Sequence, residues 1–259
     1  MSSWSNRRKL IYLFFFFLIV VIFALGIWYL FFYKAPTCFD GIQNQNEEWV
    51  DCGGICSKIC QNRFIIAKID WVKFDYVAPG LYNVGAYIRN ENLAGYVPKA
   101  NYVFRLYDKD GVVITERFGS MYIPPHKNTL AFERGIDTGK RIPTRVMFDF
   151  VPSEDTELLD WRKYTGKEIQ IFSKNIDLTN EDTSPSLTAD LQNDSLDTYR
   201  NVDVYAILYD IDKNVLGFSK TKIDEIAPGS TEEAVFTWVK ARGASINSKE
   251  IIPVVLQNI

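Results

Sequence analysis

The stretch "YVFRLYDKDGVVI" (Tyr102–Ile114) decides the fold, because a second copy, "VYAILYDIDKNVL" (Val204–Leu216), follows it at an offset of 102 residues. Apolar residues occupy alternate positions in both copies, as in an antiparallel strand with one face on a core. Each copy then continues into turn-forming residues, Lys109-Asp110-Gly111 and Asp212-Lys213-Asn214, which suit a hairpin. The pair therefore predicts the same hairpin twice.

The similarity extends on both sides of this hairpin. Downstream, "YIPPHKNTLAFE" matches "EIAPGSTEEAVF", and upstream "YIRNEN" resembles "DLQNDS". We infer that residues 63–150 and 167–259 are two tandem copies of one unit, joined by a linker at 151–166. Short strands with frequent turn signals and no helical period predict an all-β fold class, with two tandem antiparallel β-sandwich domains.

Alternation along the strands predicts which residues face each core. The expected core faces are Ile65, Ala67, Ile69 and Trp71; Tyr82, Val84, Ala86 and Ile88; Tyr102, Phe104 and Leu106; Leu187, Ala189 and Leu191; and Val204, Ala206 and Leu208. In the linker, Leu158, Leu159 and Trp161 are expected to pack between the two domains, with limited interdomain contact and some hinge freedom.

Phe104-Arg105-Leu106-Tyr107-Asp108 resembles the naming motif of FxLYD-type domains, which are bacterial immunoglobulin-like or fibronectin-like β-sandwiches. The second copy departs from the motif, because Ala206 stands where the phenylalanine would be. The resemblance implies cell-envelope modules whose ligand is unassigned. Neither copy contains cysteine, so the Cys…Trp…Cys pattern of immunoglobulin domains is missing.

An uncharged apolar run, Leu10–Tyr33, precedes the sandwiches and is long enough for a single transmembrane helix. Arg7, Arg8 and Lys9 precede it, whereas all 32 acidic residues of the chain follow it. The positive-inside rule then predicts a cytoplasmic stub at 1–9 and an extracytoplasmic remainder. A cleaved signal peptide is the alternative, but the run is long for one and no A-x-A site follows it. A buried core helix is disfavoured by the length and the unbroken apolarity.

All four cysteines lie in the segment 34–62, at Cys38, Cys52, Cys56 and Cys60. Paired C-x2-C zinc knuckles and a C-x-x-C redox motif are missing. Outside the membrane, an even number of clustered cysteines predicts disulfides, here two, with three possible pairings. Zinc binding and free thiols are the alternatives.

Four oxygen-bearing residues of this segment, Asp40, Asn44, Glu47 and Asp51, are weak candidates for calcium binding. Their spacing is not that of an EF-hand loop, and turn-forming, solvating roles are the simpler interpretation. The segment resembles a motif of the form C-x-DG-x-x-N-x-x-E-x-x-VDCGG-x-C, which recurs in extracellular and membrane-anchored, largely bacterial proteins beside β-rich domains. This resemblance implies location rather than activity.

Residues with catalytic potential are few and poorly placed. His126, the only histidine, lies in a turn without a nucleophile motif around it, and no phosphate loop or H-E-x-x-H motif occurs. The acid pairs Asp108/Asp110 and Asp210/Asp212 repeat in equivalent hairpins, as turn-capping residues do. Tyr107 and Tyr209 fit either a binding patch or ordinary packing. Catalytic, metal and cofactor-binding residues are therefore not assigned.

We expect a non-enzymatic single-pass cell-membrane protein that presents two sandwiches as an envelope spacer or binding module. Its expected partners are the membrane and an envelope protein or polysaccharide, and the net charge of −3 gives no case for nucleic acid. The alternative function is a subunit of a membrane assembly that contacts its partners through the transmembrane helix.

Overall fold

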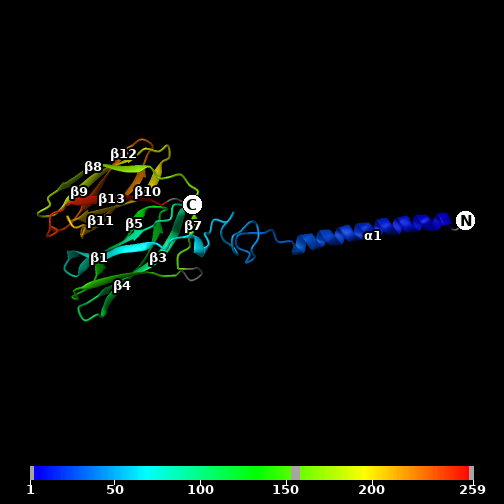
Figure 1. Ribbon diagram of the computed structural model, residues 1–259, viewed down its shortest axis with the longest axis horizontal. Coiled ribbons are helices and arrows are strands. Elements are labelled where there is room, and N and C mark those ends of the chain that lie inside the picture. The colour runs from blue at the N-terminus through cyan, green and yellow to red at the C-terminus, as the bar shows by residue number, and fades with distance from the viewer. Residues whose placement is uncertain (1–2, 153–157, 257–259) are drawn as a thin grey trace. The chain divides into compact units, whose positions relative to one another are not determined.

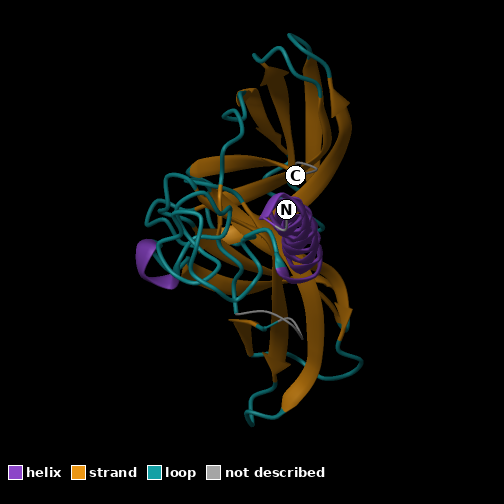
Figure 2. Cartoon of the chain, turned by 90° about the vertical axis from the view of Figure 1, so that its right-hand side faces the viewer, coloured by secondary structure: helices purple, strands orange, loops and turns teal. Residues whose placement is uncertain are grey.

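The chain folds as two compact units, Met1–Cys56 and Ser57–Ile259. The computed structural model describes residues 3–152 and 158–256. In the first unit, the helix α1 (Ser3–Phe32) is followed by a segment of turns that is closed on itself by an isolated bridge between Trp49 and Cys52. The described residues of the second unit form strands and loops apart from one short 3-10 helix, η1 (Gln61–Arg63) (Figure 2).

The helix α1 is long enough and apolar enough to span a membrane over Asn6–Phe32, with a mean hydropathy of 3.1. It begins earlier than the predicted span, and the amide of Tyr33 still donates to the carbonyl of Tyr29 at 3.0 Å, which extends the last turn. None of this apolar segment is buried against the rest of the chain. Water does not stabilise so large an apolar surface, so the helix is suited to a lipid environment.

The first sandwich consists of two antiparallel sheets, with strand orders β1-β2-β5 and β4-β3-β6, and the short strand β7 adds to β3. Proximity in sequence explains the hairpins β1–β2 and β3–β4, and the other pairs close over longer connections. The strands are β1 (Lys68–Ala78), β2 (Leu81–Arg89), β3 (Gly95–Tyr107), β4 (Val113–Ile123), β5 (Asn128–Asp137), β6 (Arg145–Phe150) and β7 (Arg162–Lys163).

The second sandwich has the same strand order, because its sheets are β8-β9-β12 and β11-β10-β13. Even local irregularities coincide: a register shift follows Leu106 in β3 and Leu208 in β10, so both Leu-Tyr-Asp strands bend at the same residue. The strands are β8 (Ile171–Thr179), β9 (Ser186–Asn193), β10 (Tyr199–Tyr209), β11 (Val215–Ile226), β12 (Thr231–Thr237) and β13 (Ser248–Val255).

The predicted core faces of four strands are confirmed. In β2, Val84, Ala86 and Ile88 are fully buried in the first core. The same holds for the predicted faces of β3, β9 and β10, all of whose members are at most 3% exposed: Tyr102, Phe104, Leu106, Leu187, Ala189, Leu191, Val204, Ala206 and Leu208.

The predicted face of the segment 65–71 is wrong. Ala67 packs in the first core, but Ile65 and Ile69 are largely exposed and Trp71 packs on the opposite side of the sheet. A register shift between Ile69 and Trp71 in β1 accounts for the side on which Trp71 packs, because one extra residue in a strand exchanges its two faces. Ile65 lies before the start of β1. After the shift, Phe74 packs against the first core.

The linker packs differently from the prediction. Leu159 and Trp161 are buried in the core of the first sandwich rather than between the domains, and Leu158 is exposed. Residues 153–157, which carry the acidic part of the linker, lie outside the described residues. The ring of Trp161 stacks on Phe64 at 5.1 Å, and its carbonyl accepts the amide of Ile59 at 2.9 Å. The linker therefore fastens the start of the second unit to the first sandwich.

The four sheets of the second unit form successive layers, from β4-β3-β6 through β1-β2-β5 and β11-β10-β13 to β12-β9-β8 (Figure 1). Separate cores fill the two sandwiches, and a third apolar cluster lies between the second and third layers. This third cluster contains buried side chains from both sandwiches, so the two sandwiches pack against each other.

Candidate functional site

The cysteine segment is a disulfide knot. Cys38 is bonded to Cys56, and Cys52 and Cys60 are disulfide-bonded as well, so no free cysteine remains among the described residues. Glu47 places a carboxylate oxygen within 4.8 Å of both sulfurs of the Cys38–Cys56 bond. A disulfide sulfur is not a thiolate and is a poor metal ligand. This cluster is therefore a crosslink and not a zinc site.

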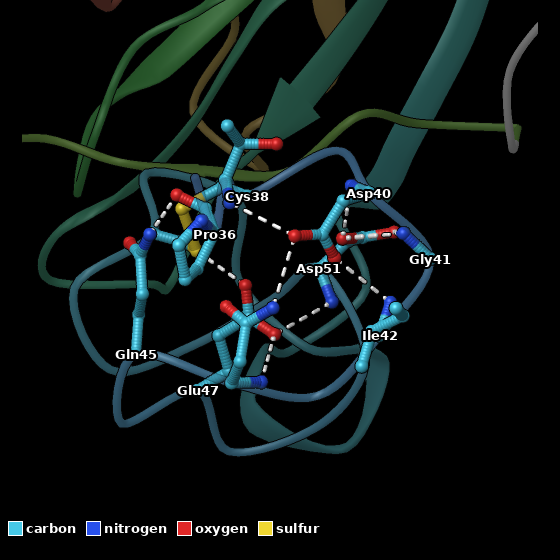
Figure 3. The surroundings of a disulfide bond; sticks show 11 residues. Pro36, Cys38, Asp40, Gly41, Ile42, Gln45, Glu47 and Asp51 are labelled. Atoms are coloured by element: carbon cyan, nitrogen blue, oxygen red, sulfur yellow. Dashed lines mark hydrogen bonds between the residues drawn. A yellow bond between two sulfur atoms is a disulfide. The ribbon is translucent and has the colours of Figure 1, made fainter. Parts of the chain in front are cut away.

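The carboxylates of Asp40 and Asp51 hold the turns of the knot together (Figure 3). Asp51 accepts the backbone amides of Asp40 and Gly41 at 2.9–3.1 Å. Asp40 accepts the amides of Thr37 and Ile42, each at 2.9 Å. The hydrogen bond from Thr37 is the main cause that lowers the pKa of Asp40, and the bond from the Asn44 side chain adds to it.

Glu47 is the buried carboxylate of the knot, at 7% exposure (Figure 3). Its Oε2 accepts the amides of Asn44 at 3.1 Å and Asp51 at 3.2 Å. Its Oε1 lies 3.2 Å from Sγ of Cys56, a sulfur that has no proton to donate once it is in a disulfide. Backbone N–H groups thus satisfy this oxygen of the buried Glu47 side chain.

The four calcium candidates lie in one small knot, but their oxygens mostly serve as acceptors for backbone amides. Asn44 presents its amide hydrogens to Asp40 at 2.9 Å, rather than its oxygen. A bound calcium ion requires six to eight oxygen ligands. Calcium binding here would displace hydrogen bonds that define the fold of the knot, and it stays a prediction.

The structure adds a packed face between the two sandwiches that was not predicted from the sequence. Trp71 stacks on Tyr87 at 5.7 Å and lies 5.6 Å from the ring of Phe218 in the other sandwich. Gly85 makes this approach possible, because a Cβ there would come within 2.8 Å of the Phe218 ring. The strand β2 therefore contributes one face to its own core and the other to the partner sandwich.

Two polar groups cross this face. Nη1 of Arg242 donates to both carboxylate oxygens of Asp75, at 2.7 and 2.9 Å, and the two side chains are only 3% and 14% exposed. Burial raises the pKa of Asp75, against the opposing effect of Arg242. At a second point, Glu250 accepts the hydroxyls of Tyr87 and Tyr209, each at 2.7 Å. Burial, together with Glu250, raises the pKa of both phenols.

The paired acids of the hairpins act in the turns. Oδ1 of Asp108 accepts the amides of Asp110 and Val112, and Oδ1 of Asp210 accepts those of Asp212 and Asn214. Hydrogen bonding from Asn214 is the main cause that lowers the pKa of Asp210. The turn-capping interpretation is therefore confirmed for Asp108 and Asp210.

The remaining sequence candidates lie at separate places. His126 is exposed in the turn between β4 and β5, with a φ of +48°, and its amide donates to the carbonyl of Asn92. Tyr107 lies under the guanidinium of Arg145 at 4.6 Å, whereas the equivalent Tyr209 is drawn into the face between the sandwiches. Tyr209 is thus a packing residue and not part of an exposed patch.

Sequence reasoning missed this face, although a signal for it was present. In β10, Tyr205, Ile207 and Tyr209 make the second side of the strand apolar too, whereas β3 carries Arg105 on that side. A nearly continuous apolar run is typical of a strand buried on both faces. Asp75, Arg242 and Glu250 offered no such pattern, because they come from distant parts of the chain.

Comparison with known proteins gives no family. No protein-family model and no curated protein matches the sequence. Among solved structures, similarity is found to red sea bream transglutaminase, with 11% identity, 75% of this chain and 32% of that chain covered, and a TM-score of 0.23. A β-glucuronidase of glycoside hydrolase family 2 has 9% identity, coverages of 87% and 29%, and a TM-score of 0.21. The chain thus spans about a third of either protein's length.

Proposed function

We propose that the chain is a non-enzymatic, single-pass cell-membrane protein, with residues 1–9 in the cytoplasm and the rest outside. It presents its two sandwiches as one paired module, a spacer or binding element for an envelope protein or polysaccharide. The observation that supports this most is the buried face between the sandwiches, which joins them through packed aromatics and the Asp75–Arg242 ion pair. Such a face fixes the distance and direction at which a surface is presented.

The same proposal includes the origin of the module. The coinciding strand orders, and the shared bend after Leu106 and Leu208, support a tandem repeat of one domain. We assign this domain to the bacterial FxLYD-type sandwiches on the Phe104–Asp108 motif.

A topology experiment tests the location. Single cysteines introduced at Ser3 and at the exposed Ser184, in a chain with its native cysteines intact, are labelled on whole cells with a membrane-impermeant maleimide. We expect labelling at position 184 only, without cleavage of the chain after Tyr33. Labelling at position 3 alone would reverse the orientation, and loss of the N-terminus from the mature protein would identify a signal sequence.

The alternative function is that of a subunit in a membrane assembly, for which the aromatic-rich helix supplies the contact. Crosslinking and pull-down from native membranes compares the native chain with one whose residues 10–33 are replaced by an unrelated apolar helix. A binding module keeps its partner after the exchange, and an assembly subunit loses it. Hydrolysis of a cell-wall polymer by the purified chain would overturn the non-enzymatic proposal.

A further inference from the structure

A cavity of about 300 Å³ opens at one edge of the face between the sandwiches. Strands β3, β4 and β5 line it from the first sandwich, and β10, β11 and β13 line it from the second. Its volume lies at the lower end of the range for small-molecule sites. Because both sandwiches contribute walls, the cavity exists only in the paired module.

The charges in the cavity are already neutralised by neighbouring side chains. Lys220 lies 2.7 Å from Asp203, and Glu133 accepts Nε of Arg117 at 3.1 Å. Glu133 also accepts the hydroxyl of Tyr102 at 3.0 Å. The walls therefore offer no strong net field for a highly charged ligand. Among the described residues that line the cavity, only Lys99, exposed at the rim, carries a charge outside an ion pair.

The cavity nevertheless has a hydrogen-bonding group that the protein does not use. Tyr205, at 6% exposure, makes no side-chain hydrogen bond to the described residues, and its ring is held by the ammonium of Lys220 at 5.3 Å. A buried hydroxyl without a partner is unfavourable, and native proteins rarely keep one without a reason.

These groups complement a ligand that both donates and accepts hydrogen bonds at several positions. Tyrosine hydroxyls and Ser120 can do both, and the second oxygen of Asp203 can only accept. The apolar part of the lining, which includes Phe132 and Val254, suits the C–H face of a ring. A polyhydroxylated ring with little or no charge combines both properties, whereas a phosphate does not.

We propose that this cavity binds one sugar unit of a polysaccharide, with the hydroxyl of Tyr205 as a hydrogen-bonding group to the ligand. The inference deepens the proposed function, since it names the ligand class of the binding module. It also assigns the buried face a second purpose, because a ligand that touches both sandwiches binds only while they are paired.

The test uses the full chain in lipid nanodiscs, titrated by calorimetry with cellotetraose, chitotetraose and tetragalacturonic acid. We expect saturable binding of at least one of them, with a Kd of about 1 mM or tighter. Preference for the galacturonic acid oligomer would show that Lys99 takes part. Absence of saturation for all three up to about 10 mM would overturn the proposal.

Variants that remove single hydroxyls test the residues. Tyr205→Phe should weaken binding by about fivefold or more, because a hydrogen bond to the ligand is lost. It should not lower the melting temperature, since this hydroxyl has no hydrogen-bond partner among the described residues. The matched control, Tyr107→Phe, removes a hydroxyl on the outer side of β3 and should leave affinity unchanged. Equal affinity in both variants would contradict the assignment.

Failure of this inference is distinguishable from failure of the proposed function. Lack of sugar binding leaves the membrane topology and a protein partner untouched. Conversely, reversed topology or a cleaved helix leaves sugar binding by the purified chain measurable.

Discussion

Asp75 and Arg242 form an ion pair that is almost withdrawn from water, and its two partners are separated by 167 residues of sequence. Removal of one partner leaves the other charge buried and unpaired, which lowers the free energy of unfolding by more than the pair itself contributes. Asp75→Ala should therefore reduce the free energy of unfolding by about 3–5 kcal/mol, and the double change Asp75→Leu/Arg242→Leu should recover much of it.

Chemical denaturation of the full chain in detergent, followed by near-ultraviolet circular dichroism, measures this effect. The control is Arg105→Ala on the outer side of β3, where the pair with Glu116 is partly solvated, and its effect should be far smaller. A double variant no more stable than Asp75→Ala would show that the pair is not the origin of the loss.

Tyr87 and Tyr209, which donate their hydroxyls to Glu250, should make the stability of the face between the sandwiches sensitive to alkaline pH. Their folded-state pKa values are raised above the ordinary value of 10.0, mainly by burial. A group with a raised folded pKa stabilises the fold fully below its unfolded pKa and loses that contribution as pH rises through the folded value. The melting temperature should therefore change little from pH 7 to about 9 and fall above about 10.

The double variant Tyr87→Phe/Tyr209→Phe tests this origin by thermal denaturation between pH 7 and 11.5. It should start from a lower melting temperature, since Glu250 loses both donors, and should then fall less steeply above pH 10. An equally steep fall would assign the alkaline sensitivity to other groups.

At the scale of the elements, one buried asparagine in each sandwich holds the ends of neighbouring strands together. The amide of Asn193 donates to the carbonyls of Asp197, Ile226 and Ala227 at 2.8–3.2 Å, and its oxygen accepts the amide of Ser195. Asn90 does the same in the first sandwich, with Gly95 and Pro124 as acceptors at 2.7 Å. One side chain thus joins the ends of three strands.

Asn90→Ala and Asn193→Ala should each destabilise the chain by about 2 kcal/mol or more, because buried carbonyls lose their donors. The control is Gln192→Ala, next to Asn193 but on the other side of β9, which should have little effect. Thermal denaturation of the three variants compares them. A loss in Gln192→Ala as large as in Asn193→Ala would contradict a specific role for the buried amide.

Elements of this fold could be predicted from the sequence where one face of a strand is polar. The alternation in "SLTADLQN" identified Leu187, Ala189 and Leu191, because Thr188, Asp190 and Gln192 lie on an uncovered sheet face. The bend in β1 could not be predicted in this way, since a bulge changes the face without changing the composition. The packing place of Trp161 could not be predicted either, because an apolar linker residue packs equally well into either domain or between the two.

At the scale of the molecule, the two sandwiches pack with unlike faces. The first contributes its β1-β2-β5 sheet and the second its β11-β10-β13 sheet, which corresponds to β4-β3-β6 of the first. Contacts between unlike faces do not close on themselves and can continue to further copies. The outer sheet of the first sandwich opposes this continuation, because Arg105 there is paired with Glu116 and Asp149 where the second sandwich has Ile207.

The face between the sandwiches should make them unfold as a single cooperative unit, since the packed cluster between them is shared by both. Gly85→Leu tests this, because any side chain there meets the ring of Phe218. We expect one calorimetric transition in the native chain and two in the variant, as the sandwiches separate and melt independently. The matched control is Thr188→Leu, at the equivalent place in β9, where the sheet face is not covered by another sandwich. This control should keep one transition.

Two transitions in the native chain would show that the packed face does not couple the domains. Because the cavity between the sandwiches is lost when they separate, Gly85→Leu should also abolish sugar binding.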